Sequence, residues 1–345
     1  MVWVLFLAAG FWALGHKMGA PRSARWLMIA LLYIAVLVAL LVLPETSPLR
    51  DALGGSYGEW LVLGVLAAMI WAYSQGLSWL KARVRPADPA PEQKRGGFTS
   101  TELERYARHI VLREIGGPGQ KKLKEAKVLV IGAGGLGAPA LQYLAAAGVG
   151  TIGVIDHDEV DNSNLQRQVI HTDDRIGMPK VFSAQEGMRA LNPYVEVRPY
   201  NRRLTEEIAA ELFADYDLIL DGTDSFEARY LANRIAARQG KPLIGAALSQ
   251  WEGQISLFDP AKGAPCYQCI FPEAPAPGLA PTCAEAGVLG PLPGVMGAMM
   301  AVEAVKQIAG AGEGLRGRML IYDALYAETR TISLKRRADC PVCGG

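Results

Sequence analysis

The apolar residues of this chain follow two different patterns. Within the first part of the chain they form long uncharged runs at residues 26–43 and 60–80, preceded by a shorter run at residues 2–14. Each long run has the length that an α-helix needs to cross a bilayer, whereas the short run reaches it only when its neighbours are included. We therefore predict a membrane anchor over residues 1–80, with three spanning helices, or two if the first run does not span.

The charges around these runs predict their orientation. Basic residues gather after the first and after the third run, whereas the connection between the second and third runs contains only Arg50. The positive-inside rule then places the first connection and everything after Leu80 in the cytoplasm. We expect a multi-pass protein of the inner (cytoplasmic) membrane whose catalytic domain lies in the cytoplasm. The basic residues are Lys17, Arg22, Arg25, Lys81, Arg83 and Arg85.

The anchor has two alternatives. A cleaved signal peptide is the alternative for residues 2–14, but no basic residue precedes this run and further apolar runs follow it. Helices buried in a soluble bundle are the alternative for all three runs. Tryptophans favour the membrane, because they lie near the ends of the runs, as interfacial aromatic residues do. They are Trp3, Trp12, Trp26, Trp60 and Trp79.

The pattern changes after the third run. Residues 81–98 are rich in proline and charge, which predicts a linker. From residue 99 onward, short apolar runs alternate with stretches of helical spacing, and Thr99 or Ser100 is placed to cap the first helix. This alternation predicts for residues 99–345 a doubly wound, mostly parallel α/β sheet with a Rossmann-like nucleotide-binding half. The expected strands are residues 127–131, 151–155, 218–221 and two within 243–258, and the expected helices are residues 136–147, 179–191, 206–213, 225–239 and 294–308.

A glycine-rich loop follows the first expected strand. Residues 132–137 read Gly-Ala-Gly-Gly-Leu-Gly and precede an expected helix, so the loop backbone, Gly135 included, and the helix N-terminus can receive a phosphate group. Asp156 ends the next strand, where a carboxylate can accept hydrogen bonds from ribose hydroxyls. These features predict a nucleotide site, and they fit NAD and ATP equally well.

The polar segment at residues 163–168 favours ATP. Arg167 and Asn164 can face the phosphates, and the planar, permanently charged guanidinium of Arg167 suits phosphate oxygens. Lys180 can supply a second positive charge at the start of a helix, whereas a nicotinamide site needs no such charges. Asp224 follows a buried strand and can bind Mg²⁺ through its carboxylate, and capping the next helix is its alternative role.

Four of the five cysteines form two C-x₂-C pairs, Cys266 with Cys269 and Cys340 with Cys343. Four thiolates suit a closed, tetrahedral structural Zn²⁺ site. Two disulfides or four free thiols are the alternatives, and a cytoplasmic location argues against disulfides. The fifth cysteine, Cys283, lies in a Pro- and Gly-rich loop that we expect to be exposed.

Taken together, these motifs resemble the sulfur-carrier adenylyltransferases of the ThiF/MoeB/HesA family, which are related to ubiquitin-activating enzymes. The resemblance extends from about Tyr106 to Cys343. The branch that activates the molybdopterin-synthase carrier is the most similar, followed by the thiamine-pathway branch. The chain departs from the family at Ser225, where an asparagine is usual. The matching segments are the two cysteine pairs and residues 105–108, 132–137, 163–168, 177–180, 221–224, 252–254 and 282–287.

The resemblance implies a nucleotidyltransferase that uses ATP and Mg²⁺ to adenylylate the C-terminal glycine carboxylate of a ubiquitin-like sulfur carrier, with release of pyrophosphate. Since this carboxylate is already charged at neutral pH, the reaction needs positioning and charge neutralisation rather than a general base. The carrier would end in Gly-Gly. The implied nucleotide site consists of Gly135, Asp156, Ser163, Asn164, Leu165, Gln166, Arg167, Lys180, Asp224 and Ser225, with Gln168 orienting polar groups nearby.

The resemblance also implies a homodimer in which Arg108 reaches into the partner's site as an arginine finger, and a structural Zn²⁺ at the paired cysteines. It implies a covalent link between Cys283 and the carrier or its sulfur. A surface charge is the alternative for Arg108, and an incidental thiol is the alternative for Cys283. The expected catalytic residues are Arg108, Arg167, Asp224 and Cys283, whereas His109, His157 and His171 are expected to be structural or exposed.

Partners and alternatives follow from the remaining features. The formal net charge of +1 predicts no nucleic acid partner. No sulfurtransferase-like extension follows Cys343, so we expect a separate sulfur donor. A carrier of molybdenum cofactor biosynthesis is favoured, and a thiamine-pathway carrier is the alternative. An NAD-dependent oxidoreductase and a non-catalytic membrane scaffold for carrier proteins are the alternatives of other classes.

Overall fold

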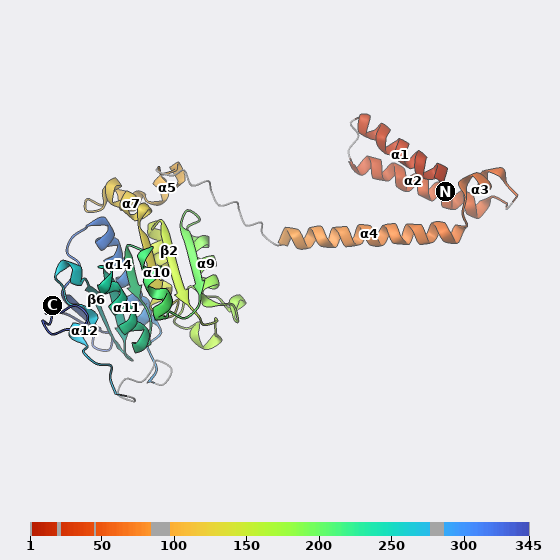
Figure 1. Cartoon of the computed structure of the whole chain (residues 1–345). Helices are drawn as coiled ribbons and strands as arrows, with labels where there is room; N and C mark the ends of the chain where they lie inside the picture. The colour runs from red at the N-terminus through yellow and green to blue at the C-terminus, as the bar shows by residue number, and fades with distance from the viewer. Residues whose placement is uncertain (1, 19–21, 45, 84–96, 277–285, 345) are drawn as a thin grey trace. The chain divides into compact units, whose positions relative to one another are not determined.

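Two units make up the chain, Met1–Asp88 and Pro89–Gly345, and each is considered by itself (Figure 1). The computed structural model describes residues 2–18, 22–44, 46–83, 97–276 and 286–344. Cys283 lies outside these described residues, so its predicted role is not addressed by the fold.

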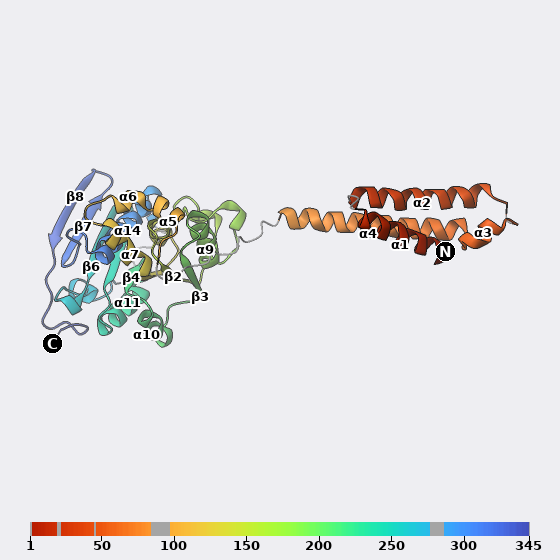
Figure 2. The same cartoon turned by 90° about the horizontal axis from the view of Figure 1, so that it is seen from above.

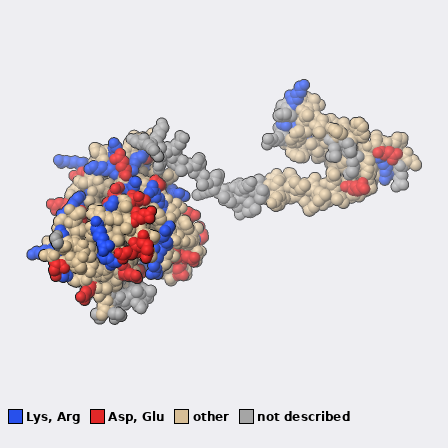
Figure 3. Space-filling model, in the orientation of Figure 1, with Lys and Arg blue, Asp and Glu red and all other residues tan. Residues whose placement is uncertain are grey.

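The N-terminal unit is helical where it is described, and all three apolar runs form helices, as predicted. Only a small apolar cluster is buried within it, namely Val4, Val36, Leu40 and Trp60. Many other large apolar side chains are exposed, and the face of this unit seen in Figure 3 carries few charges. Its helices are α1 (Val2–Lys17), α2 (Arg22–Val42), α3 (Pro48–Leu53) and α4 (Tyr57–Arg83).

Among the described residues, two helical stretches are long and apolar enough to cross a membrane, Ser23–Val42 and Pro48–Gly76. Only 11% and 6% of their most apolar windows are buried within the unit. The remaining apolar stretch, Phe6–Gly15, is shorter. The 16 residues of α1 rise about 24 Å, less than the roughly 30 Å of a hydrocarbon core. The length of α1 therefore fits the two-span alternative better than three spans.

The C-terminal unit is built on a sheet with the strand order β3-β2-β1-β4-β5-β6-β7-β8 (Figures 1 and 2). The first five strands in this order are parallel, and β6 to β8 continue the sheet antiparallel. The predicted mostly parallel, doubly wound α/β class is thus confirmed. The strands are β1 (Lys127–Ile131), β2 (Thr151–Asp156), β3 (Glu196–Asn201), β4 (Leu218–Asp221), β5 (Leu243–Leu248), β6 (Glu252–Phe258), β7 (Arg318–Asp323) and β8 (Glu328–Ser333).

Side chains alternate between the two faces of the sheet along each buried strand. Because these side chains are apolar on both faces, helices cover both faces. In β1, Val128 and Val130 belong to one apolar core, and Leu129 and Ile131 belong to the other. One core includes residues of α7 (Gly116–Glu125), α8 (Gly137–Ala147), α9 (Lys180–Leu191) and α14 (Pro291–Ala309). The other includes residues of α10 (Glu206–Ala214), α11 (Phe226–Arg238) and α12 (Tyr267–Ile270).

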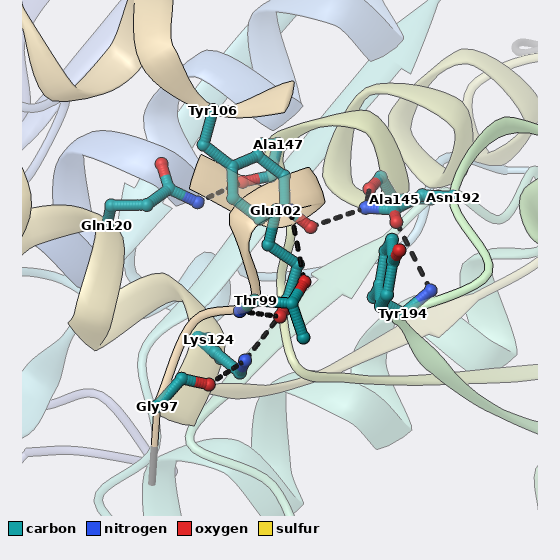
Figure 4. A network of polar contacts seen from close by, with 10 residues as sticks. All are labelled: Gly97, Thr99, Glu102, Tyr106, Gln120, Lys124, Ala145, Ala147, Asn192 and Tyr194. Carbon is teal, nitrogen blue, oxygen red and sulfur yellow. Dashed lines mark hydrogen bonds and ion pairs between the residues drawn. The ribbon is translucent and has the colours of Figure 1, made fainter. Parts of the chain in front are cut away.

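A polar network fixes the start of the C-terminal unit (Figure 4). The Thr99 hydroxyl accepts a hydrogen bond from the Glu102 N–H at 3.2 Å, and the Glu102 carboxylate accepts one from the Thr99 N–H at 2.8 Å. This reciprocal capping box makes Thr99, rather than Ser100, the cap of α5 (Ser100–Arg105). The buried Glu102 carboxylate also pairs with Lys124 at 2.7 Å, so α5 is joined to α7.

The same network continues to the next short helix, α6 (Ala107–Ile110). The buried Tyr106 hydroxyl accepts a hydrogen bond from the Asn192 amide at 2.7 Å, and the same amide nitrogen lies 2.7 Å from the Ala145 carbonyl (Figure 4). Ala145 and Asn192 lie at the C-terminal ends of α8 and α9, which lead into β2 and β3. The segment that carries Arg108 is therefore held at the amino ends of the parallel strands.

The Glu102 carboxylate predicts a pH-dependent stability. Burial disfavours the charge, but hydrogen bonds from Lys124 and Thr99 outweigh it and lower the pKa of Glu102 below its usual 4.5. A group with a lowered folded-state pKa stabilises the fold above its unfolded pKa, and this contribution is lost as the pH falls. We expect Glu102→Gln to lower the free energy of unfolding by about 1–3 kcal/mol at pH 7, and the difference from wild type to narrow below pH ~4.5.

Calorimetric unfolding of the full-length chain at pH 7 and pH 4 measures this difference. The matched control is Glu125→Gln, because Glu125 makes an exposed pair with Lys121 at 3.8 Å and should contribute only a few tenths of a kcal/mol. Equal stability of Glu102→Gln and wild type at pH 7, or a difference that persists unchanged at pH 4, would contradict the proposed contribution.

Candidate functional site

A cavity of about 1010 Å³ opens at the carboxyl edge of the parallel sheet, the edge at which β1, β2 and β4 end. The chain leaves β1 toward β2 on one side, whereas β4 lies on the other side of β1. Ligands of open α/β sheets bind at such a switch point, outside the carboxyl ends of the strands. The walls include Gly132, Gly135, Asp156, Arg167, Lys180 and Asp224.

The glycine loop follows β1 directly and leads into α8. Gly132 has a φ of +92°, a conformation that other residues rarely adopt, and an added Cβ would lie 3.1 Å from the Gly222 carbonyl oxygen. The Asp156 carboxylate accepts hydrogen bonds from the Ala133 N–H and the Asp158 N–H, each at 2.8 Å. Asp156 therefore orients the loop in addition to lining the cavity.

The polar segment after β2 sends only part of its side chains into the cavity. Arg167 and Gln168 line it, whereas Ser163, Asn164, Leu165 and Gln166 do not. The Arg167 guanidinium donates to the Asn164 side-chain oxygen at 2.9 Å and to the Ser163 carbonyl at 3.2 Å. Asn164 thus holds Arg167 from behind. Nucleotide contacts of the segment's other residues remain predictions.

Gln168 is buried, and its side-chain oxygen has no hydrogen-bond partner within the described part of the chain. A buried amide oxygen without a partner is costly, so a donor supplied by a ligand or by water would stabilise it. Because Gln168 lines the cavity, this oxygen fits the role of orienting polar groups there.

Lys180 begins α9, and its ammonium group lies 2.8 Å from the Asp158 carboxylate. The Lys180 side chain is only 7% exposed. Burial disfavours the Asp158 charge, but the hydrogen bond and charge of Lys180 outweigh this and lower the pKa of Asp158. The ion pair holds the Lys180 ammonium at the cavity, where phosphate oxygens would find a second positive charge beside Arg167.

The strand end at β4 presents two carboxylates with different roles. Asp221 is buried, accepts hydrogen bonds from the Thr223 N–H and hydroxyl at 3.0 and 2.7 Å, and pairs with Arg229 at 3.4 Å. Asp224 lines the cavity, and no described residue donates a hydrogen bond to its carboxylate. It is therefore available to a cation such as Mg²⁺, which prefers oxygen ligands.

The alternative role of Asp224 as a helix cap is wrong. The N-cap of α11 is Ser225, whose hydroxyl accepts a hydrogen bond from the Ala228 N–H at 3.4 Å. A serine hydroxyl satisfies the first free N–H groups of a helix as well as an aspartate does, so the one-residue shift has little energetic cost. It leaves Asp224 outside the helix and facing the cavity. The predicted nucleotide contact of Ser225 remains a prediction.

The cavity is also lined by four arginines that no sequence motif indicated, Arg202, Arg203, Arg229 and Arg234. Arg202 and Arg203 directly follow the carboxyl end of β3, the position that Gly132 holds after β1. Recognition of β3 as a strand would have placed them at this edge. By contrast, Arg108 is exposed on α6 at the amino ends of the strands and does not line the cavity of its own chain.

The four paired cysteines meet in one buried cluster. Their sulfur atoms lie within 4.8 Å of one another, with Cys266–Cys269, Cys266–Cys340 and Cys269–Cys343 separations of 4.0, 3.6 and 3.4 Å. No disulfide joins them, so the disulfide alternative does not hold. Thiolates around Zn²⁺ at about 2.3 Å would be about 3.8 Å apart in a tetrahedron, which the observed separations match.

The surroundings of the cluster also suit a cation. Burial raises the pKa of Cys266 and of Cys269, so these thiols need a positive charge to ionise. Burial also tends to raise the pKa of Cys340. Hydrogen bonds from the Val342 and Cys343 N–H groups outweigh this effect and lower the pKa of Cys340 to about 7. Two more N–H donors reach the sulfurs, from Asn233 to Cys266 at 3.7 Å and from Arg337 to Cys269 at 3.5 Å.

Comparison with known proteins identifies relatives of the C-terminal unit. A family model described as the ThiF family matches residues 106–342. The sulfur carrier protein adenylyltransferase of Thermus thermophilus is 49% identical over 251 residues, which cover 72% of this chain and 93% of that protein. The SAMP-activating enzyme E1 of Haloferax volcanii is 48% identical over 245 residues, covering 71% of this chain and 90% of that protein.

Other relatives are longer. The adenylyltransferase and sulfurtransferase MOCS3 of Bos taurus is 44% identical over 264 residues, which cover 76% of this chain and 57% of that protein. Among solved structures, Escherichia coli MccB with ATP aligns with a TM-score of 0.60 at 24% identity, over 70% of this chain and 75% of that chain. The latter similarity concerns the fold alone.

Proposed function

The chain belongs to the ThiF family and is a nucleotidyltransferase, and we propose that it adenylylates the C-terminal carboxylate of a ubiquitin-like sulfur carrier. One observation carries this proposal. At a single edge of the sheet, the cavity combines a glycine loop with two positively charged side chains and one carboxylate. The charged side chains, Arg167 and Lys180, are held in place by Asn164 and Asp158, and no described residue donates a hydrogen bond to the carboxylate of Asp224. This combination suits a nucleoside triphosphate with its metal, and the relatives named as sulfur-carrier adenylyltransferases support the carrier as the second substrate.

In the proposed reaction, a carboxylate oxygen of the carrier's terminal glycine attacks the α-phosphorus of ATP. A new P–O bond forms, the bond between the α-phosphorus and the bridging oxygen breaks, and pyrophosphate leaves with that electron pair. No proton is transferred, so no general base is needed. The main barrier is repulsion between two anions, and fixed positive groups in a partly enclosed cavity lower it.

The lining residues divide this task. The Gly135 backbone and the start of α8 border the phosphates, and Asp156 receives the ribose hydroxyls. Arg167, held by Asn164, and Lys180, held by Asp158, neutralise phosphate charge. Asp224 would hold Mg²⁺, which neutralises charge on the leaving pyrophosphate when bound. Ser225 supports Asp224 by capping the helix behind it.

We propose a homodimer in which Arg108 completes the partner's site. The location of Arg108 at the amino ends of the strands supports this, because the cavity of the same chain opens at the carboxyl ends. The docked segment around Tyr106 gives Arg108 a rigid support. For Cys283 we propose contact with the carrier tail or its sulfur, as the family resemblance implies.

The resemblance favours the small subunit of molybdopterin synthase as the carrier, with a thiamine-pathway carrier as the competitor. Sulfur would come from a separate donor. Incubation of the full-length chain with ATP, Mg²⁺ and either purified carrier, followed by mass measurement of the carrier, distinguishes them. The proposed carrier should gain the mass of one AMP minus water. Adenylation of the thiamine-pathway carrier alone would reassign the pathway, and modification of neither carrier would refute the proposed activity.

Asp224→Ala should abolish carrier-dependent exchange of pyrophosphate into ATP, with a loss of at least about 100-fold, because the metal loses its carboxylate ligand. The exposed position of Asp224 means that the thermal unfolding temperature should not change. Glu125→Ala, at an exposed site far along the chain on α7, is the control for expression and handling. Retention of exchange activity would remove Asp224 from the proposed machinery.

A second inactive variant, Arg108→Ala, tests the arrangement in trans. When Arg108→Ala and Asp224→Ala chains are co-expressed, half of the dimers are mixed and each mixed dimer has one complete site. About a quarter of the wild-type activity should therefore return. No recovery would show that Arg108 acts within its own chain, and full activity of Arg108→Ala expressed alone would show that Arg108 takes no part.

We propose that the N-terminal unit anchors the enzyme in the inner (cytoplasmic) membrane, with the catalytic unit in the cytoplasm. The two long apolar stretches and the exposed apolar side chains around them support this. The full-length chain should stay in the membrane pellet after an alkaline carbonate wash and should require detergent for extraction. Its recovery in the wash supernatant would refute the anchor.

We further propose that the cysteine cluster binds one structural Zn²⁺. The purified chain should contain about one Zn²⁺. Cys269→Ser should lose the metal and unfold at a lower temperature, because three thiolates remain at a buried site. Cys283→Ser, which removes the cysteine outside the cluster, should keep the full zinc content. A correctly folded wild-type chain without metal would contradict this assignment.

A further inference from the structure

His171 is buried behind the glycine loop, and both of its ring nitrogens are engaged. Nε2 lies 2.9 Å from the Ala133 carbonyl oxygen, and Nδ1 lies 2.9 Å from the Ser183 hydroxyl on α9. A carbonyl can only accept, so Nε2 must carry the proton and donate it to Ala133. Burial lowers the pKa of His171, so the ring is neutral near pH 7 and Nδ1 accepts from Ser183.

The bond to Ala133 determines which way the next peptide points. In a trans peptide the C=O and the following N–H lie in one plane and point in opposite directions across the C–N bond. Since the Ala133 carbonyl points toward His171, the Gly134 N–H points away from it. Gly134 lines the cavity, whereas Ala133 and His171 do not. Within the described residues, the Gly134 N–H has no hydrogen-bond acceptor.

The loop by itself does not enforce this orientation. Glycine populates positive and negative φ about equally, so the peptide between Ala133 and Gly134 can rotate and present its carbonyl oxygen to the cavity instead. A carbonyl oxygen there would repel phosphate. The peptide before Ala133 is already held, because the Asp156 carboxylate accepts the Ala133 N–H. The hydrogen bond from His171 fixes the next peptide, the one between Ala133 and Gly134.

We propose that His171 is a positioning residue that fixes the Ala133–Gly134 peptide with its N–H toward the triphosphate of ATP. The inference rests on the proposed function, since it assigns the phosphates to this loop. His171 touches no substrate. It acts through the loop backbone, and its contact with Ser183 relates the loop to α9, the helix that begins with Lys180.

Three variants of the full-length chain in detergent test this role by calorimetric titration with ATP and with adenosine. His171→Phe keeps a ring of similar size but has no donor. Its ATP affinity should fall about 10- to 100-fold, the range for a lost hydrogen bond to a charged group. Adenosine lacks phosphates, so its affinity should change by no more than about twofold, which corresponds to ~0.4 kcal/mol of binding free energy.

His171→Gln places an amide N–H near the former Nε2 and should restore ATP affinity to within about threefold of wild type. Ser183→Ala is the matched control, because it removes the partner of Nδ1 and leaves the bond to Ala133 intact. It should also bind ATP within about threefold of wild type.

Normal ATP binding by His171→Phe would overturn the inference. So would an equal loss of ATP and adenosine affinity with a lower unfolding temperature, because that pattern indicates a packing role, and so would a His171→Gln variant as weak as His171→Phe. The proposed function fails in a different way. In that case the wild-type chain itself would not bind ATP.

Discussion

The parallel pairing of β1 with β2 and with β4 is the constraint on which the site depends. Its register sets Ile131 opposite both Ile155 and Asp221, so the three strands end level with one another. The backbone then continues this match, because Gly132 donates to Ile155 and Gly222 donates to Ile131. As a result the glycine loop, Asp156 and the segment of Asp224 emerge side by side. A one-residue slip would send the side chains of a strand to the opposite face and separate these groups.

Beyond the strand ends, where apolar packing stops, buried polar contacts fix the conformation of the loops. Arg229 pairs with Asp221 at 3.4 Å and donates to the Thr223 carbonyl at 2.7 Å, which fixes the turn before Asp224. One helical turn later, Asn233 accepts the Tyr267 N–H at 2.8 Å beside the cysteine cluster. Helix α11 therefore joins the cluster to the cavity. A metal in the cluster would stiffen the support of Asp224 although it takes no part in the chemistry.

The parts of the fold that could be predicted from the sequence are those in which local pattern and final environment agree. β1, β2 and β4 are buried on both faces and appear as uninterrupted apolar runs. β3 and β8 are edge strands, and every residue of β8 is exposed, so no apolar pattern marks them. Pro199 can lie in β3 because an edge strand has no neighbour on one side. Two of the missed strands, β3 and β8, are thus strands that the core does not require to be apolar. β7 was missed as well although it is internal, between β6 and β8, so an edge position does not account for it.

The same distinction holds in the site. Arg167 and Lys180, which line the cavity, could be predicted as candidate site residues because positive charge beside a glycine loop has a direct chemical reason. His171 could not, since its role depends on a carbonyl 38 residues away in the chain and on a peptide plane that no motif describes. The cap at Ser225 was missed for a related reason. Aspartate and serine are equally good N-caps, so the sequence does not decide between Asp224 and Ser225 until the first residue of the helix is known.

The proposed membrane anchor has a consequence for the proposed dimer. The large apolar side chains of the N-terminal unit, with Leu41 and Ile70 each 70% exposed, are favourable only in an apolar environment, at roughly 25 cal/mol for each Å² removed from water. In the arrangement we propose, the anchor confines the chains to one plane and raises their effective concentration for pairing. Arg108 does not line the cavity of its own chain, so in this proposed arrangement the complete site would exist only in the dimer. Anchoring then favours the assembled enzyme without any additional contact between catalytic units.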